Sequence, residues 1–398
     1  MARRVSFPDL ATLRPTRAEV SLDALEANLA WARQRTGGLP VLAVVKANAY
    51  GHGAVEVARC LQSAGVEHLA VALLEEAREL RGAGVTLPIL VMGALEPAQM
   101  PEVLRLEVTP ALFRPDQIDA LQRCAAAAGR RQPLHLKIDT GMGRLGIRWD
   151  RCTPLLDDLV RRTHLELQGI FSHFACADDP SSELTAMQIE RFAKVLSAAR
   201  ERGLNPPLIH LANSAAVLAR PPAWLSMVRP GLLLYGYRPS ALLPEAPLRP
   251  VLRLSTRIVL LKEIEPGDAV GYGATFVARK PSRIATVAAG YDDGVMRSLS
   301  NRGRFLVGGQ PAPIVGRVSM DLTTLDVTEI PLARAGDEAV LIGGQGDSFQ
   351  GADQVAADAG TISWEVLCGI GWRVPRLYRR GDRVVAVRSR FGDTGENR

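Results

Sequence analysis

The chain lacks the sequence features of exported, membrane-spanning and zinc-binding proteins. No apolar stretch in its 398 residues reaches the roughly 18 residues of a membrane span, and no apolar segment follows the N-terminal arginines. The five cysteines are dispersed and form no Cys-x-x-Cys pair, a usage typical of a reduced protein. We therefore predict a cytoplasmic protein with no membrane contact and no metal site.

Charge of one sign is not concentrated anywhere, and lysine is scarce. The net charge is +6, but no block of five or six like charges occurs, so a nucleic-acid partner is not expected. Because a lysine amine can form a Schiff base and an arginine guanidinium cannot, a lysine-dependent enzyme would have few candidates here. Of the 48 basic residues only five are lysines: Lys46, Lys137, Lys194, Lys262 and Lys280.

The first part of the chain alternates short apolar runs with longer amphipathic stretches, which predicts parallel strands joined by helices. The runs cover residues 41–45, 68–72, 88–92, 107–112, 134–138, 167–171, 208–211 and 226–228. Eight runs favour a (β/α)₈ barrel, preceded by a helix that starts at the capping residue Ser21. An open doubly wound sheet is the alternative, but it would more often carry a glycine-rich phosphate loop after its first strand.

A change of sequence pattern near residue 245, from alternating strand and helix signals to short β-rich runs, predicts a second domain. Pro244, Pro247 and Pro250 precede short β-rich runs at residues 257–264, 283–288, 304–307, 323–327 and 339–342, with one amphipathic stretch at 352–359. We predict an α/β chain with a barrel domain over residues 17–245 and a mainly antiparallel β domain over residues 246–390. The first 20 or so residues are able to pack with the second domain.

Polar residues follow five of the eight runs, at the strand ends where barrel enzymes carry their catalytic groups. They are Lys46, Lys137, Arg144, His173, Asn213, Ser214, Arg229 and, with them, Gly231. A single polar residue in such a place is usually only a loop residue, but their convergence predicts a site. At Lys46, desolvation would lower the pKa of the amine, unless the side chain extends to solvent.

Lys137 needs a negative partner or a modification, because a lysine that faces the interior of a barrel is otherwise costly. Pairing with Asp139 is one interpretation. A carbamylated lysine that bridges two metal ions is another, but it requires a His-x-His pair, and the six histidines form none. In the β domain, glycines frame Tyr272 and Tyr291, which indicates either exposed phenols at a ligand or hairpin tyrosines packed over a sheet.

Five strings, taken in order, closely resemble those of bacterial alanine racemase, a pyridoxal-phosphate enzyme with a barrel and a β domain. They are Ala43-Val-Val-Lys-Ala-Asn-Ala-Tyr-Gly-His-Gly, Lys137-x-Asp-Thr-Gly-Met-Gly-Arg, Gly271-Tyr-Gly-Ala-Thr, Gly290-Tyr-x-Asp-Gly and Val315-Gly-Arg-x-Ser-Met-Asp. The match runs from about Arg17 to Arg380. The resemblance implies interconversion of L-alanine and D-alanine, with D-alanine supplied for peptidoglycan, in a homodimer with shared active sites.

The resemblance also implies roles for individual residues. Lys46 would bind the cofactor and act as one base, and Tyr272, contributed by the partner subunit, would act as the second base on the opposite face of the α-carbon. A neighbouring cation at His173 would help the Tyr272 phenolate to form. The implied cofactor contacts are Tyr50, His173, Asn213, Ser214, Arg229, Gly231, Leu232 and Trp372.

Substrate binding is assigned by the same resemblance. Arg144 and the backbone of Met320 would hold the substrate carboxylate, with Arg144 supported by a carbamylated Lys137, and His210 would orient Arg229 at the pyridine nitrogen. Supporting positions are Tyr291 and Asp321. Tyr291, Arg297, Arg317 and Asp178 would line a narrow access route that favours a small amino acid.

Two departures from the family pattern stand out: Trp372 replaces a tyrosine that contacts phosphate, and Ser319 replaces a common cysteine. Three rival functions share part of this pattern. A related amino-acid decarboxylase would carry a Gly-Gly-Gly phosphate loop and a catalytic cysteine segment, and neither occurs. A single-domain cofactor carrier would lack Tyr272. A racemase of broad specificity is the third, because the size of the substrate pocket is not visible in one sequence.

Overall fold

The computed structural model describes residues 13–390, which divide into two compact units. The barrel unit comprises residues 25–49 and 57–249. The β unit comprises the described residues up to Ala24, residues 50–56 and the described residues from Pro250 onward. The chain therefore passes from the barrel unit into the β unit and back within the segment that follows Lys46.

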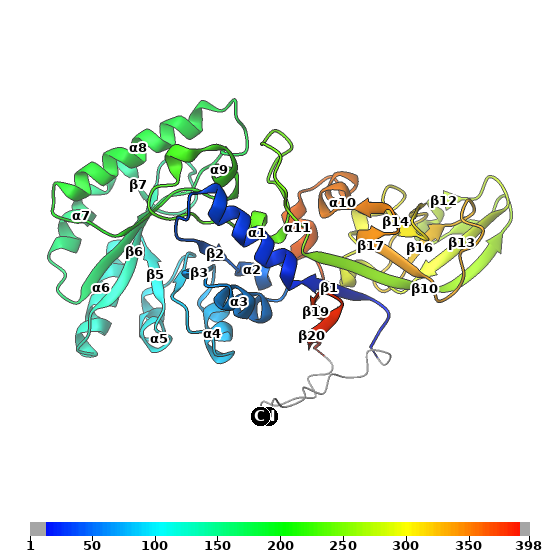
Figure 1. Ribbon diagram of the computed structural model, residues 1–398, viewed down its shortest axis with the longest axis horizontal. Helices are drawn as coiled ribbons and strands as arrows, with labels where there is room; N and C mark the ends of the chain where they lie inside the picture. The colour runs from blue at the N-terminus through cyan, green and yellow to red at the C-terminus, as the bar shows by residue number, and fades with distance from the viewer. Residues whose placement is uncertain (1–12, 391–398) are drawn as a thin grey trace. The chain divides into compact units, whose positions relative to one another are not determined.

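The barrel unit is built on seven parallel strands that alternate along the chain with helices (Figure 1). Their order in the sheet is β2 (Leu42–Val44), β3 (His68–Val71), β4 (Ile89–Val91), β5 (Thr109–Leu112), β6 (Gln132–Asp139), β8 (Leu165–Phe171) and β9 (Leu208–His210), and the short β7 (Ile147–Arg148) pairs with β6. The predicted eighth run forms hydrogen bonds at both edges of this sheet. Ser226 N donates to Ile209 O (3.2 Å), and Leu42 N donates to Val228 O (2.9 Å).

The fold prediction is thus confirmed, with one difference in detail. The eighth run forms only a single parallel bridge, Val41 with Val228, and not a regular strand. Alternation of parallel strands and helices buries both faces of the sheet, which explains why the runs are almost wholly apolar. At the carboxyl ends of these strands lie the loops that carry the predicted site residues of this unit.

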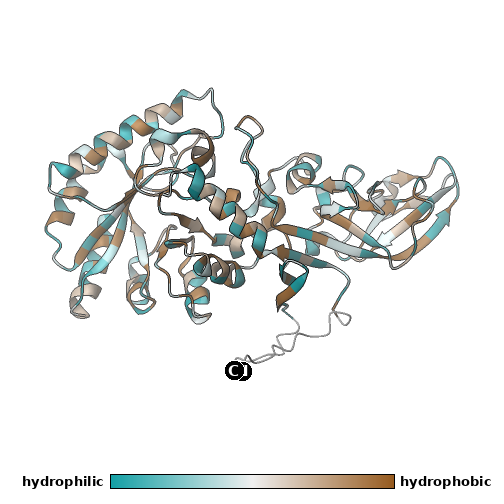
Figure 2. Ribbon diagram, viewed as in Figure 1, coloured by the Kyte–Doolittle hydropathy of each residue, from teal (hydrophilic) through white to brown (hydrophobic). Residues whose placement is uncertain are grey.

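The helices of the first half of the chain follow the predicted amphipathic stretches. They are α1 (Leu22–Arg35), α3 (Ala54–Ser63), α4 (Leu74–Gly82), α5 (Met100–Arg105), α6 (Pro115–Ala127), α7 (Thr153–Val160), α8 (Glu183–Arg200) and α9 (Ser214–Ala219). Ser21 caps α1 as expected, because its hydroxyl accepts a hydrogen bond from Ala24 N (3.1 Å). The longest, α8, carries both hydrophobic and hydrophilic residues (Figure 2) and buries one stripe that includes Gln188 and Phe192.

The β unit is a mainly antiparallel sheet centred on the long strand β10 (Leu252–Ile264). Its path is β15 (Gln310–Pro313), β14 (Arg304–Val307), β17 (Glu338–Gln345), β10, β1 (Arg17–Ser21), β19 (Arg376–Arg380) and β20 (Arg383–Arg388). Off this path lie β13 (Ser282–Val287), β16 (Thr323–Asp326) and β18 (Ser348–Gln350), with a separate hairpin of β11 (Ala269–Val270) and β12 (Phe276–Val277). Two helices, α10 (Ala352–Ala359) and α11 (Ser363–Cys368), complete it.

Strand β1 was not predicted from the sequence, although its burial alternates along Arg-Ala-Glu-Val-Ser. It pairs antiparallel with β10 and parallel with β19, so the N-terminal segment belongs to the β unit. In the part of the chain that the structure describes, no helix is long and apolar enough to span a bilayer.

Candidate active site

Four cationic side chains come together at the strand ends of the barrel unit. Lys46 follows β2, Lys137 lies in β6, Arg144 lies in the next loop and Arg229 follows the eighth run. Lys137 is only 7% exposed. Burial, and to a smaller extent the cations of Arg229, Arg144 and Lys46, lower the pKa of the amine to about 8, while Asp139 acts in the opposite direction. This end of the barrel therefore carries excess positive charge, which suits an anionic ligand.

The remaining lysines, Lys194, Lys262 and Lys280, lie elsewhere and are exposed. Lys194 pairs with Glu190 on α8 (2.7 Å), and Lys280 pairs with Glu329 (2.7 Å). The carboxylate raises the pKa of Lys280, in contrast to Lys137. Among the described residues, no cluster of three histidine, cysteine or acidic side chains could hold a metal ion.

Arg229 is held by a line of hydrogen bonds through two buried histidines. One of its amino groups donates to His210 Nδ1 (2.7 Å), and His210 Nε2 lies 2.9 Å from His135 Nδ1. Because a guanidinium can only donate, His210 Nδ1 must accept, so His210 carries its proton on Nε2 and donates it to His135. Burial, with smaller effects of neighbouring charges, lowers the pKa of His135 to about 3 and that of His210 well below 6.5. Both rings are therefore neutral.

His135 is a part of the site that the sequence prediction missed. It lies in β6 and needs Gly169 on β8 opposite it, because a Cβ at that position would collide with the imidazole ring. His210 in turn stacks on Phe171, with ring centres 4.8 Å apart and planes 5° apart. The only sequence signal was a histidine two residues before Lys137 in the predicted strand run 134–138.

The structure corrects the expected charge of His173. The second amino group of Arg229 donates to Ser172 O (2.9 Å) and lies 3.1 Å from His173 Nδ1, which must therefore accept. Burial lowers the pKa of His173 well below 6.5, and the nearby cations of Arg229, Arg144, Lys137 and Lys46 lower it further. His173 is a neutral imidazole in this setting, so the prediction that it supplies a cation is wrong.

A left-handed helical turn follows Lys46. Ala47, Asn48, Ala49 and Tyr50 all have φ of 52° or 53°, a region that ordinary L-residues avoid at about 1–2 kcal/mol per residue. Two hydrogen bonds hold the turn: Ala49 N donates to Val45 O (2.9 Å), and Ala47 N donates to the Glu76 carboxylate (2.6 Å). The turn starts directly at Lys46, two residues after the end of β2, so it fixes the position of the Lys46 backbone.

Ser214 organises a second part of the predicted site. Its hydroxyl accepts from Gly231 N (2.9 Å) and from Leu233 N (3.3 Å), and Asn213 caps α9 by accepting from Ala216 N (3.1 Å). No acceptor for the Ser214 proton occurs among residues 13–390, and the side chain is 6% exposed. A buried hydroxyl that still has its proton to donate fits an anionic oxygen such as that of a phosphate.

The other predicted residues lie in the β unit. Tyr272 stands between Gly271 and Gly273, which have φ of 75° and 72°, and the phenol is 73% exposed. Tyr50 is 7% exposed, and Trp372 is 63% exposed with the Arg390 guanidinium 3.2 Å from the ring centroid. The indole thus carries a cation on its face at the position where the family pattern has a tyrosine.

Arg373 joins Met320, Asp321 and the Tyr291 segment into one cluster. Its guanidinium contacts Asp321 (2.8 Å), Asp293 (2.8 Å) and Met320 O (3.2 Å), and Tyr291 N donates to Ser319 O (2.9 Å). The Asp293 side chain is fully buried and also pairs with Arg14 (2.5 Å). The sequence analysis gave no role to Asp293, although this residue is part of the string Gly290-Tyr-x-Asp-Gly, or to Arg373, which lies 80 residues further along the chain.

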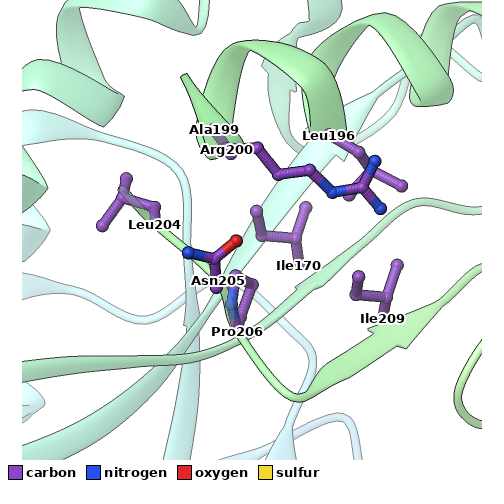
Figure 3. A pocket seen from close by; sticks show the side chains of 8 residues that line it. All are labelled: Ile170, Leu196, Ala199, Arg200, Leu204, Asn205, Pro206 and Ile209. Carbon is purple, nitrogen blue, oxygen red and sulfur yellow. The ribbon is translucent and has the colours of Figure 1, made fainter. Parts of the chain in front are cut away.

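One small cavity lies elsewhere in the barrel unit, between the end of α8 and strands β8 and β9 (Figure 3). It is lined by Ile170, Leu196, Ala199, Arg200, Leu204, Asn205, Pro206 and Ile209, none of which belongs to the predicted site. The cavity is therefore separate from the charged cluster described above.

Family models for the two alanine racemase domains match almost the whole chain. The N-terminal domain matches residues 20–239, and the C-terminal domain matches residues 251–378. The chain belongs to the alanine racemase family. The alanine racemase of Sorangium cellulosum is 46% identical over 379 residues, covering 92% of this chain and all of that protein. That of Syntrophobacter fumaroxidans is 45% identical over 365 residues, covering 91% of this chain and 97% of its own length.

Solved alanine racemases have the same fold. The enzyme from Bacillus anthracis with bound L-Ala-P aligns with a TM-score of 0.89 at 36% identity, covering 97% of this chain and 99% of that one. The enzyme from Clostridium difficile 630 gives 0.90 at 34% identity, covering 94% of this chain and 98% of that one. Alanine racemases are pyridoxal-phosphate-dependent isomerases, so this chain interconverts L-alanine and D-alanine with that cofactor.

Proposed function

We propose that Lys46 and Tyr272 are the two bases of this alanine racemase and that they act on opposite faces of the substrate α-carbon. Interconversion of mirror images needs one group that removes the α-proton and another that returns a proton from the other side. The observation that carries the proposal is the cluster of cations at the strand ends, which holds the Lys46 amine beside Lys137, Arg144 and Arg229. Such a site favours an anionic cofactor and a substrate carboxylate.

Several of the predicted residues would hold the cofactor, and among them the buried Ser214 hydroxyl has a proton to donate to an anion. Ser214, Asn213, Gly231, Leu232, Tyr50 and Trp372 would bind the phosphate end, and His173 and Arg229 would contact the ring. Pyridoxal phosphate, when bound, supplies an electron-accepting ring that makes the α-proton acidic. Because an arginine guanidinium stays protonated in proteins, Arg229 would orient a ring nitrogen without giving up a proton.

The substrate carboxylate would be held by Arg144 and the backbone of Met320. The side chain of Arg144 has no hydrogen-bond partner within residues 13–390, and the Lys137 cation lies within its electrostatic range. A carbamate on Lys137 would turn this cation into an anion that pairs with Arg144. The neutral Lys137 amine would attack carbon dioxide at carbon and release one proton as the carbamate forms.

We further propose a homodimer in the cytoplasm in which each β unit completes the active site of its partner, with domain limits near residues 17–245 and 246–390. Exposure supports the dimer, since Tyr272 is 73% and Met320 51% exposed in the single chain. Tyr291, Arg297, Arg317 and Asp178 would line the access route and restrict it to small amino acids. This enzyme would then supply D-alanine for peptidoglycan.

The two-base assignment is tested by isotope exchange in D₂O. Tyr272→Phe should slow the conversion of either enantiomer by about 10²–10⁴-fold but leave α-hydrogen exchange into one of them. If exchange into both enantiomers fell equally, Tyr272 would not be a base for one face. Incubation with L-alanine, L-serine and L-lysine, followed by chiral separation, measures the substrate range.

A further inference from the structure

The buried side chain of Gln188 joins two loops of the barrel unit. Gln188 lies on α8 and is fully buried. Its amide nitrogen donates to Thr140 Oγ1 (3.1 Å) and to His173 O (2.9 Å), and its amide oxygen accepts from Ala175 N (3.0 Å). Thr140 belongs to the loop after β6 and His173 to the loop after β8. The three hydrogen bonds of this single amide group therefore connect the loop after β6 to the loop after β8.

The loop after β6 is held from several sides at this point. Thr140 Oγ1 lies 2.8 Å from Ser172 Oγ, and the Ser172 carbonyl accepts from Arg229 (2.9 Å). On the outer side, Arg191 of α8 donates to Thr140 O (2.9 Å). The network therefore extends from α8 through both loops to Arg229.

Asp139 folds the rest of this loop. Its carboxylate accepts from three successive backbone N–H groups, those of Gly141 (2.9 Å), Met142 (3.0 Å) and Gly143 (3.1 Å). Arg144 follows directly on this turn. The path from Gln188 to Arg144 is thus a short stretch of backbone in which the N–H groups of residues 141–143 and the carbonyl of Thr140 are all hydrogen-bonded.

We propose that Gln188 is a positioning residue for substrate recognition, which acts by fixing Arg144 relative to His173 and Arg229. The proposal rests on the substrate-carboxylate role proposed above for Arg144. Gln188 touches neither substrate nor cofactor. Instead, its amide sets the distance between the loop that carries the carboxylate-binding arginine and the loop that carries His173. Displacement of a binding group by about 1 Å can reduce catalytic efficiency by about 100-fold.

Gln117 provides a matched control for a merely structural role. It is also fully buried, its amide nitrogen donates to Leu95 O (2.8 Å), and its amide oxygen accepts from Phe113 N and Arg114 N (both 3.1 Å). It therefore joins the loops after β4 and β5 in the way that Gln188 joins those after β6 and β8. None of the residues bonded to Gln117 has a proposed role in the reaction.

The experiment compares Gln188→Met with Gln117→Met, since methionine keeps the length of the side chain and removes its hydrogen bonds. Both variants should lose similar thermal stability. Gln188→Met alone should raise the KM for alanine by about tenfold or more, with a smaller change in kcat. In the cofactor-free protein, it alone should also speed amide hydrogen exchange at residues 140–144 and 173–176, a readout that does not depend on turnover.

Equal KM values for the two methionine variants would overturn the proposal, and so would unchanged exchange in both loops. If Gln188→Met does not fold, Gln188→Glu replaces it: this variant keeps the acceptor for Ala175 N but loses both donated bonds, and the same shifts are expected. Arg144→Lys separates the two proposals. An unchanged KM in that variant would reject the role of Arg144 itself, whereas a raised KM there and a normal KM in Gln188→Met would reject only the role of Gln188.

Discussion

Lys137 should react with carbon dioxide under mild conditions, whereas the other lysines outside the active site should not. With its pKa lowered to about 8, about half of the Lys137 amine is neutral at pH 8. A lysine with the usual pKa of about 10.5 is only roughly 0.3% neutral at that pH. The neutral amine is the form that attacks carbon dioxide, so burial among cations raises the reactive fraction by about 150-fold. In the proposal above, Arg144 would then stabilise the resulting anion.

The assay equilibrates the purified protein with ¹³C-bicarbonate at pH 8 and detects the carbamate by carbon NMR. Alkylation then traps the carbamate, and peptide mass spectrometry locates it. Lys280 serves as an internal control, because its pairing with Glu329 raises its pKa and it is exposed. Absence of label at Lys137 with bicarbonate in excess would refute the reasoning, as would equal labelling at Lys280. Degassing at lower pH should remove the label and raise the KM for alanine.

Three further outcomes follow from the same structure. Lys137→Met should raise the free energy of unfolding at pH 7 by up to about 3 kcal/mol, measured with urea without carbon dioxide, because the fall in the Lys137 pKa from 10.5 to about 8 reflects an unfavourable buried cation. Since the pKa in the folded state lies below that in the unfolded state, this gain should persist below pH 8 and vanish as the pH rises to 10.5. A gain that does not depend on pH would contradict this explanation. Asp293→Asn removes the carboxylate that Arg14 and Arg373 share, so it should lower the free energy of unfolding by about 3–5 kcal/mol. A loss below about 1 kcal/mol would show that these residues do not form a buried ion pair in solution. Borohydride reduction of the cofactor-loaded enzyme should label one tryptic peptide, the one that contains Lys46, and label on a second lysine peptide would count against its assignment.

The barrel was predictable because its strands are buried on both faces, so each reads as a short apolar run. For the eighth run, the sequence could not show that it would not form a regular strand. In the structure, Ser226 and Val228 form hydrogen bonds at the edges of the sheet, with only a single bridge. Strand β1 was missed because two buried residues, Ala18 and Val20, give too short an alternation to separate it from the helix that follows.

The site was predictable where function requires a rare residue type at a strand end, as at Lys46 and Lys137. It was not predictable where long-range contacts decide, as for Asp293 with Arg373. Gln188 did carry a signal, because it is a polar residue on the apolar stripe of α8, between Thr185 and Phe192. The neutral state of His173 depends on where Arg229 donates, and no sequence pattern contains that information.

The left-handed turn after Lys46 has a stereochemical consequence. Along residues 47–50, the backbone takes the hand that D-amino acids prefer, in a chain built of L-residues. A D-alanine introduced at position 47 or 49 by chemical ligation would therefore fit this turn with less strain than the natural L-alanine. An enzyme that interconverts mirror-image substrates thus carries Lys46 directly before a short stretch of backbone of the opposite hand.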